Sequence, residues 1–176
     1  MAITATKATV DQPSAPSLHV ARPEPAPGLG SEHIVIVQSD HRMSYYAGSQ
    51  WAAELPRVVE TLAVERLRGS GAWQAVSDSE SAFASEYFLQ ISIRRFEAEY
   101  TSDAAPTAYV TLDCAIGRRS DRLLIASFTA QGAAPASANR VGAVVAAFEQ
   151  AANAALSQLV EASAAVVKSS QAPSNP

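Results

Sequence analysis

The sequence predicts an α/β domain, in which a mixed, largely antiparallel sheet of about five strands is covered by two main helices. Three observations support this prediction. Residues 54–68 and 138–168 carry apolar side chains at three- and four-residue steps, the spacing of amphipathic helices. Residues 87–100, 109–116 and 123–130 alternate apolar and polar side chains, and the short turns between them are typical of antiparallel neighbours. The length of 176 residues suits one domain with one core.

The N-terminal region combines prolines with strand-like segments. Half of the ten prolines lie near the N-terminus, at Pro13, Pro16, Pro23, Pro25 and Pro27. Because proline fixes φ and lacks a backbone donor, residues 1–16 are predicted to be a disordered tether or a cloning remnant. Short strands are predicted at 18–21 and 34–38, with an extended connector between them. The domain is predicted to span 17–168, followed by a disordered tail at 169–176.

An aromatic segment precedes the first helix. The pattern HRMSYYAGSQW, residues 41–51, fits either a strand with a loop or an ordered aromatic loop. Pro56 then lies in the first turn of the helix, where a missing N–H costs little, and Gly69 and Gly71 end it. A short strand is predicted at 73–76.

Two features of the later segments affect the predicted shape. The alternation in 87–100 shifts by one residue at Arg94 and Arg95, which predicts a β-bulge. The last helix, at roughly 1.5 Å per residue, would be about 45 Å long. Because this exceeds the length expected for the sheet, the C-terminal half of the helix is expected to project.

Composition and charge exclude several classes of protein. Charged residues make up 17% of the chain and the formal net charge is −4, which argues against nucleic-acid binding. Cys114 is the only cysteine, so neither a disulfide framework nor a set of thiol ligands is expected. No stretch is long and apolar enough to predict a membrane helix.

The sequence predicts no catalytic, metal or cofactor site. His19, His33 and His41 have spacings that match no metal-binding pattern. Cys114 lies on the apolar face of its strand, which favours a core residue over a nucleophile. Neither a glycine-rich phosphate loop nor a serine-nucleophile motif is present.

The charged residues of the sheet allow two interpretations. Glu97 and Glu99 share a strand face and could form an acid–base pair, but Arg95 on the same face favours a solvated, ion-paired surface. Arg118 and Arg119 lie in a turn, where they could bind phosphate or simply be solvated.

Tyr45, Tyr46 and Trp51 form the most unusual local group of side chains. Protein interfaces are enriched in aromatic residues, so these three are the candidate interface. The alternative is a loop tucked under the sheet.

Several motifs in order resemble one known family. Residues 23–51 contain a Pro-rich segment, a strand and the signature YYA-x-x-x-W, which is formed by Tyr45, Tyr46, Ala47 and Trp51. The motifs that follow are LPRVVETLAVERL, SGAWQAV, RRFEAEY and the helical segments VVAAFEQA and LSQLV. Together they resemble the ABC-type transport auxiliary lipoproteins, the PqiC-like family, over residues 17–165.

The resemblance implies a non-enzymatic subunit without a cofactor. Such proteins are similar to periplasmic components of MCE-type lipid transport systems that link the inner-membrane transporter to the outer membrane. The implied fold is similar to the N-terminal domain of TolB, and the implied partners are an MCE-domain protein and further copies of the chain.

The family's N-terminal anchor is the point where this sequence departs from the pattern. The resemblance implies a signal peptide and an acylated lipobox cysteine, and Cys114 cannot replace that cysteine. We expect that the chain was cloned without its anchor, because residues 1–16 are typical of a tether. The alternative is a member that is not acylated.

A second class of function stays open at the level of sequence. A small lipid-binding domain or enzyme of similar build would hold a ligand between sheet and helix. Glu97, Glu99 or His41 would then supply its polar group.

Overall fold

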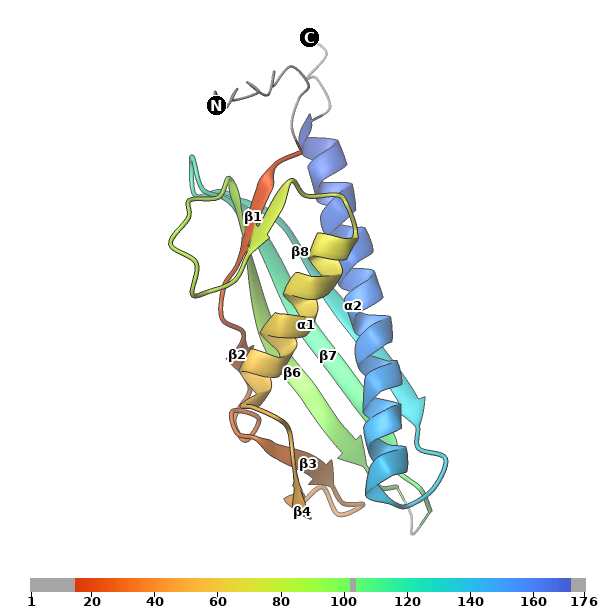
Figure 1. Ribbon diagram of the computed structural model, residues 1–176. Helices are drawn as coiled ribbons and strands as arrows, with labels where there is room; N and C mark the ends of the chain where they lie inside the picture. Colours follow the sequence, from red (N-terminus) through yellow and green to blue (C-terminus); the bar gives the residue numbers. More distant parts are fainter. Residues whose placement is uncertain (1–14, 102–103, 172–176) are drawn as a thin grey trace, which may run out of the picture.

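The computed structural model describes residues 15–101 and 104–171. Residues 1–14 of the predicted tether and 172–176 of the predicted tail lie outside the described residues. Two helices pack on one face of a mixed sheet (Figure 1), which confirms the predicted fold class.

Three long strands form the antiparallel half of the sheet. They are β6 (Tyr87–Glu99), β7 (Thr107–Arg118) and β8 (Leu124–Pro135), adjacent in that order. Their side chains alternate between the two faces, and the apolar set of β6 and β7 is buried. The register between β6 and β7 shifts between Ile93 and Arg95, which confirms the predicted bulge.

The other side of β6 is lined by three short strands in a row. They are β1 (Ser17–Val20), β2 (Glu24–Pro25) and β3 (His33–Val37), and all are parallel to β6. Prolines limit β1 and β2, because Pro16, Pro23 and Pro25 donate no backbone hydrogen bond to a neighbouring strand, whereas β3 ends at the hairpin turn to β4. β4 (Met43–Gln50) extends the sheet beside β3, and β5 (Ala75–Ser77) extends it beside β1.

The sheet therefore has eight strands in the described residues, compared with about five expected. β2 has two residues, too few to show an alternating pattern, whereas β5 overlaps the short strand predicted at 73–76. β4 is part of the aromatic segment for which the sequence allowed either a strand with a loop or an ordered loop.

Both helices bury one side against the sheet. α1 (Leu55–Gly69) and α2 (Val141–Gln171) lie on the same face (Figure 1). The C-terminal half of α2 does not project as expected, because Leu159, Val166 and Val167 are buried. Strands of 12 and 13 residues make the sheet about 40 Å long, close to the length of the helix.

α2 also covers the outer edge of β8. A Cβ atom at Gly132 would overlap the carbonyl oxygen of Ala151, so glycine lets the helix approach the strand directly. The Gln131 N–H donates a hydrogen bond to Gln158 Oε1 at 3.0 Å, and Gln158 Nε2 donates one to the Gln131 carbonyl at 2.9 Å. The side-chain amide of Gln158 thus satisfies the backbone N–H and carbonyl of Gln131, which would otherwise pair with a neighbouring strand.

The domain is elongated along β6 and has two distinct ends. The proximal end is where β1 and β6 begin and where the β7–β8 turn lies (Figure 1). The distal end is where β6 finishes and where the β3–β4 turn lies. Within the described residues, neither helix has the length and apolarity needed to cross a membrane.

Candidate interaction site

The aromatic segment becomes strand β4 because it pairs with β3 as a hairpin. Val35 faces Tyr45 and Ile36 faces Ser44 in the antiparallel register. The hairpin turn is closed by a hydrogen bond from the Gln38 N–H to the Arg42 carbonyl at 2.9 Å. Side chains alternate along β4, so Tyr45 and Tyr46 point to opposite faces.

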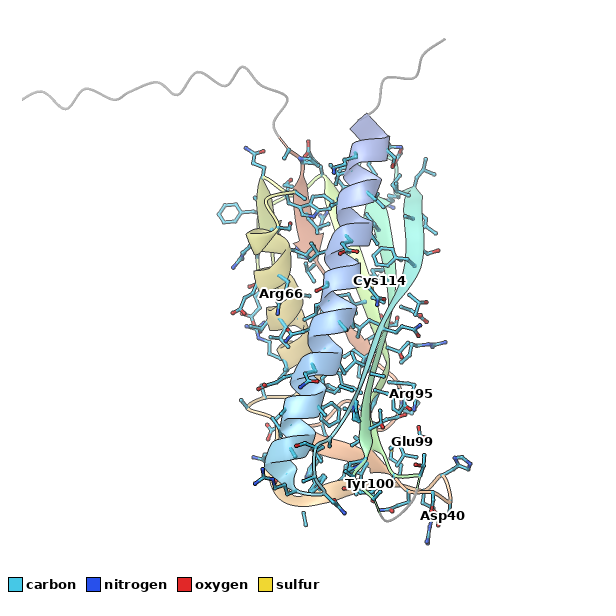
Figure 2. All side chains as sticks on the ribbon, turned by 90° about the vertical axis from the view of Figure 1, so that its right-hand side faces the viewer. Asp40, Arg66, Arg95, Glu99, Tyr100 and Cys114 are labelled. Carbon is cyan, nitrogen blue, oxygen red and sulfur yellow. The ribbon has the colours of Figure 1, made fainter. Side chains whose placement is uncertain are left out.

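A chain of three polar groups joins separate segments at the distal end. Tyr46 Oη lies 2.9 Å from Tyr100 Oη, and Tyr100 Oη donates a hydrogen bond to Asn139 Oδ1 at 2.8 Å. Because a phenol has a single proton, Tyr46 must donate to Tyr100. The chain links β4, the end of β6 and the residues before α2, and Figure 2 shows Tyr100 at this end of the molecule.

Burial is the largest cause that raises the pKa of Tyr100 above its ordinary value of 10.0. The hydrogen bond and the electrostatic interaction with Tyr46 act in the same direction. Tyr100 is therefore a neutral hydrogen-bonding group at physiological pH, which does not favour a role as a general base.

An open hollow of about 920 Å³ lies around this chain. Aromatic, amide and hydroxyl groups share its wall, and Tyr45 is 48% exposed at its rim. The remaining lining comes from the β3–β4 hairpin and the start of α2: Ile36, Gln38, Ser39, Ala47 and Val141. An open surface with tyrosine and neutral polar groups is typical of a protein contact site.

Trp51 lies in a different environment. Its ring packs edge-on against Phe96 and Phe148, with centroid distances of 5.5 and 5.2 Å. Phe96 and Phe148 stack on each other at 5.2 Å. Both Tyr45 and Tyr46 thus line the hollow, although they point to opposite faces of β4, whereas Trp51 is partly buried in an aromatic cluster that packs against the core.

Sequence reasoning did not find Tyr100 and Asn139 as members of the site. Tyr100 ends the alternating pattern of its strand, and Asn139 precedes a helix, where its residue type indicates a cap. Their meeting with Tyr46 depends on how β4, β6 and α2 are placed in space, for which the sequence carries no local signal.

The other sequence candidates have structural roles. Arg95 lies 2.7 Å from Glu97 and 2.6 Å from Glu99, and its guanidinium stacks 4.3 Å from the centre of the Tyr109 ring. These contacts confirm the ion-paired surface (Figure 2). Among the described residues, no group of three His, Cys, Asp or Glu side chains could hold a metal ion.

Cys114 is buried as predicted, with 3% of its surface exposed. Burial, with a smaller contribution from the charge of Asp113, raises the pKa of its thiol to about 12. A nucleophilic role would require an exposed thiolate, so the thiol is part of the core.

The space between sheet and helices is filled. The cavity there measures about 10 Å³ and is lined by side chains of α1, β6, β7 and α2 such as Val59, Leu112 and Leu156. This is about the space of one water molecule. Within the described residues, this cavity between sheet and helices is too small for a lipid acyl chain.

Comparison with known proteins gives a consistent picture. A model of the family described as ABC-type transport auxiliary lipoprotein component matches residues 2–160. The chain is similar to the crystal structure of protein XCC0632 from Xanthomonas campestris, with a TM-score of 0.84 and 28% identity over 98% of this chain and 97% of that one. It is also similar in fold to the hypothetical protein CT253 from Chlamydia trachomatis, with a TM-score of 0.60 and 9% identity over 89% and 99% of the two chains. No protein of curated function matches the sequence.

Proposed function

This chain belongs to the ABC-type transport auxiliary lipoprotein component family, and from that premise we propose that it is a non-enzymatic periplasmic subunit of an MCE-type lipid transport system. It would link the inner-membrane transporter to the outer membrane. Its direct partner in this proposal is the MCE-domain protein of the transporter, and further copies of the chain are a second partner.

The observation that carries the proposal is the open hollow at the distal end. Tyr45, Tyr46, Tyr100 and Asn139 present aromatic surface and neutral hydrogen-bonding groups to solvent. Tyrosine supplies large contact area at low conformational cost, which favours recognition of a protein surface. The filled space between sheet and helices favours this function over binding of a ligand inside the domain.

The family's description as a lipoprotein supports the proposed location. We place the protein in the periplasm, held at the outer membrane by a lipid on a cysteine that would precede this sequence. β1 begins at the proximal end, so an N-terminal anchor would hold that end toward the membrane and leave the distal end free.

Binding to the MCE-domain protein of the same transport system tests the proposal. Tyr45→Ala combined with Tyr46→Phe removes one ring and the hydrogen bond to Tyr100. We expect the Kd to rise roughly 30-fold, because buried tyrosines are frequent hot spots worth about 2 kcal/mol. Surface plasmon resonance with the immobilised partner measures it.

A matched control uses Phe83, which is 83% exposed and lies at the proximal end. Phe83→Ala should leave the affinity unchanged. Equal affinity of the tyrosine variant and the unmodified chain would show that the distal hollow is not part of the interface. A stoichiometric lipid released on extraction and seen by native mass spectrometry would instead favour the lipid-binding alternative.

A further inference from the structure

The β7–β8 turn combines exposed leucines with arginines. Leu123 is 54% exposed and Leu124 is 64% exposed. Residues 117–124, GRRSDRLL, contain three arginines and one aspartate, so the turn is locally basic although the whole chain is acidic. Single exposed apolar side chains are common on protein surfaces. Adjacent large ones are uncommon unless the surface contacts a partner or a membrane.

Hydrogen bonds fix the shape of the turn. The Arg118 N–H donates to the Leu123 carbonyl at 2.9 Å. Arg118 Nη2 lies 2.9 Å from Asp121 Oδ2, and the Leu123 N–H donates to Asp121 Oδ1 at 3.2 Å. Arg122 has a φ of 58°, in the left-handed region that tight turns use.

Two of the three arginines keep their charge available. Asp121 neutralises Arg118, and the hydrogen bond from Arg118 lowers the pKa of Asp121, so this pair stays ionised. Arg119 and Arg122 are exposed, and no ion pair of either guanidinium occurs within the described residues. Two free positive charges therefore stand directly beside two exposed leucines.

The turn lies where the N-terminal segment leaves the domain. The Ser17 N–H donates to Glu86 Oε2 at 3.0 Å, and the Glu86 N–H donates to Ser17 Oγ at 3.0 Å. The Arg119 N–H donates to the Glu86 carbonyl at 2.8 Å. The start of β1 and the turn are thus joined through a single residue, and Figure 1 shows both at the proximal end.

We propose that Arg119, Arg122, Leu123 and Leu124 form a docking surface for the surface of an anionic phospholipid bilayer. Guanidinium groups match the geometry of phosphate oxygens, and leucine side chains gain free energy on leaving water for the acyl boundary. A nucleic acid or an acidic protein would use the arginines but would gain little from two adjacent leucines. The inference goes beyond the partner contact proposed above and does not depend on it.

The position of the turn fits a contact with the membrane surface. A basic patch near an anionic surface adds electrostatic attraction to whatever else holds the protein there. The basic turn beside the start of β1 has the position and the charge for such a contribution.

Co-flotation with vesicles of defined composition tests the proposal on the chain without any lipid anchor. The unmodified chain should float with phosphatidylglycerol vesicles, bind phosphatidylcholine vesicles much more weakly, and dissociate as salt is added. Arg119→Gln with Arg122→Asn should lower the partition coefficient roughly 30-fold, because each arginine near an anionic surface contributes roughly fivefold. Asparagine is chosen at position 122 because it tolerates a positive φ.

A second pair of substitutions separates the contribution of the leucines to membrane binding from that of the charges. Leu123→Ser with Leu124→Ser should lower binding on the order of tenfold at unchanged net charge. Arg140→Gln with Met43→Ser, at exposed positions of the distal end, is the control and should bind as the unmodified chain does. Far-UV circular dichroism verifies that each variant is folded.

Three outcomes would overturn the proposal. The unmodified chain could fail to float with phosphatidylglycerol vesicles, or the control could lose as much binding as the arginine variant. Binding that depends on the arginines but not on the leucines would assign the turn to an anionic polymer or an acidic protein surface. Affinity for the MCE-domain protein, measured on the arginine and leucine variants of the turn, should not change.

Discussion

Tyr45 and Trp51 lie six positions apart in the chain but have opposite surroundings. Tyr45 is half exposed at the rim of the hollow, with a ring contact to His33 at 5.0 Å. Trp51 packs edge-on against both Phe96 of β6 and Phe148 of α2. Substitutions at the two positions should therefore act on different properties of the protein.

Trp51→Ala should lower the free energy of unfolding by about 3 kcal/mol, because it removes a large ring from the aromatic cluster. Tyr45→Ala should lower it by less than about 0.5 kcal/mol, since exposed substitutions have small effects. Urea unfolding followed by far-UV circular dichroism measures both. Equal and small effects would show that Trp51 contributes little to the core.

The thiol of Cys114 should be inert in the folded protein. Its pKa is raised from 9.0 to about 12 because burial disfavours the thiolate. The neutral thiol is thus favoured by folding, so its contribution to stability is complete below pH 9 and is lost as the pH rises toward 12.

A disulfide reagent at pH 8 should modify the thiol only after denaturant is added, with Cys114→Ala as the unreactive control. Rapid labelling of the native protein would contradict the burial.

At the scale of elements, the edge of β8 depends on one side chain of α2. Gln158→Ala removes both hydrogen bonds to the Gln131 backbone and should lower the free energy of unfolding by about 1–2 kcal/mol. The uncovered strand edge should also increase self-association, which analytical ultracentrifugation detects. Gln150→Ala, at an exposed position of the same helix, is the matched control. A stability loss equal in both variants would indicate an effect on the helix alone.

The elements differ in how well the sequence predicts them. β6, β7, α1 and α2 are long enough for their periodic patterns to be read, and the phase shift at Arg94 and Arg95 correctly located the bulge. β2 is defined by its pairing with β6, which no local pattern records, whereas β5 overlaps the short strand predicted at 73–76. The expected projection of α2 was wrong because the length of the sheet depends on strands that run past their predicted ends.

The interaction site was only partly predictable. Tyr45 and Tyr46 could be found because two adjacent tyrosines are conspicuous in a chain with 7% aromatic residues. Trp51 shares the signature but points to the core, a difference that depends on where β4 ends. Tyr100 and Asn139 join Tyr46 from distant parts of the sequence, so only the tertiary structure identifies them.

For the whole molecule, the two proposed surfaces lie at opposite ends of β6. The β7–β8 turn lies at the proximal end and the β3–β4 hairpin at the distal end (Figure 1). The hairpin lines the tyrosine hollow. Thirteen residues of strand separate the ends by about 40 Å. A domain docked on a membrane by one end would thus present the other end to a partner.

The row formed by β1, β2 and β3 has a mechanical consequence. The chain enters β1 at the proximal end, and all three strands run parallel to β6. A pulling force between a membrane at one end and a partner at the other would act along these strands. The hydrogen bonds to β6 run across the direction of that force. The load would then be shared by many bonds in shear instead of opening them one at a time. The segment from β1 to β3 would therefore transmit a pulling force into the sheet.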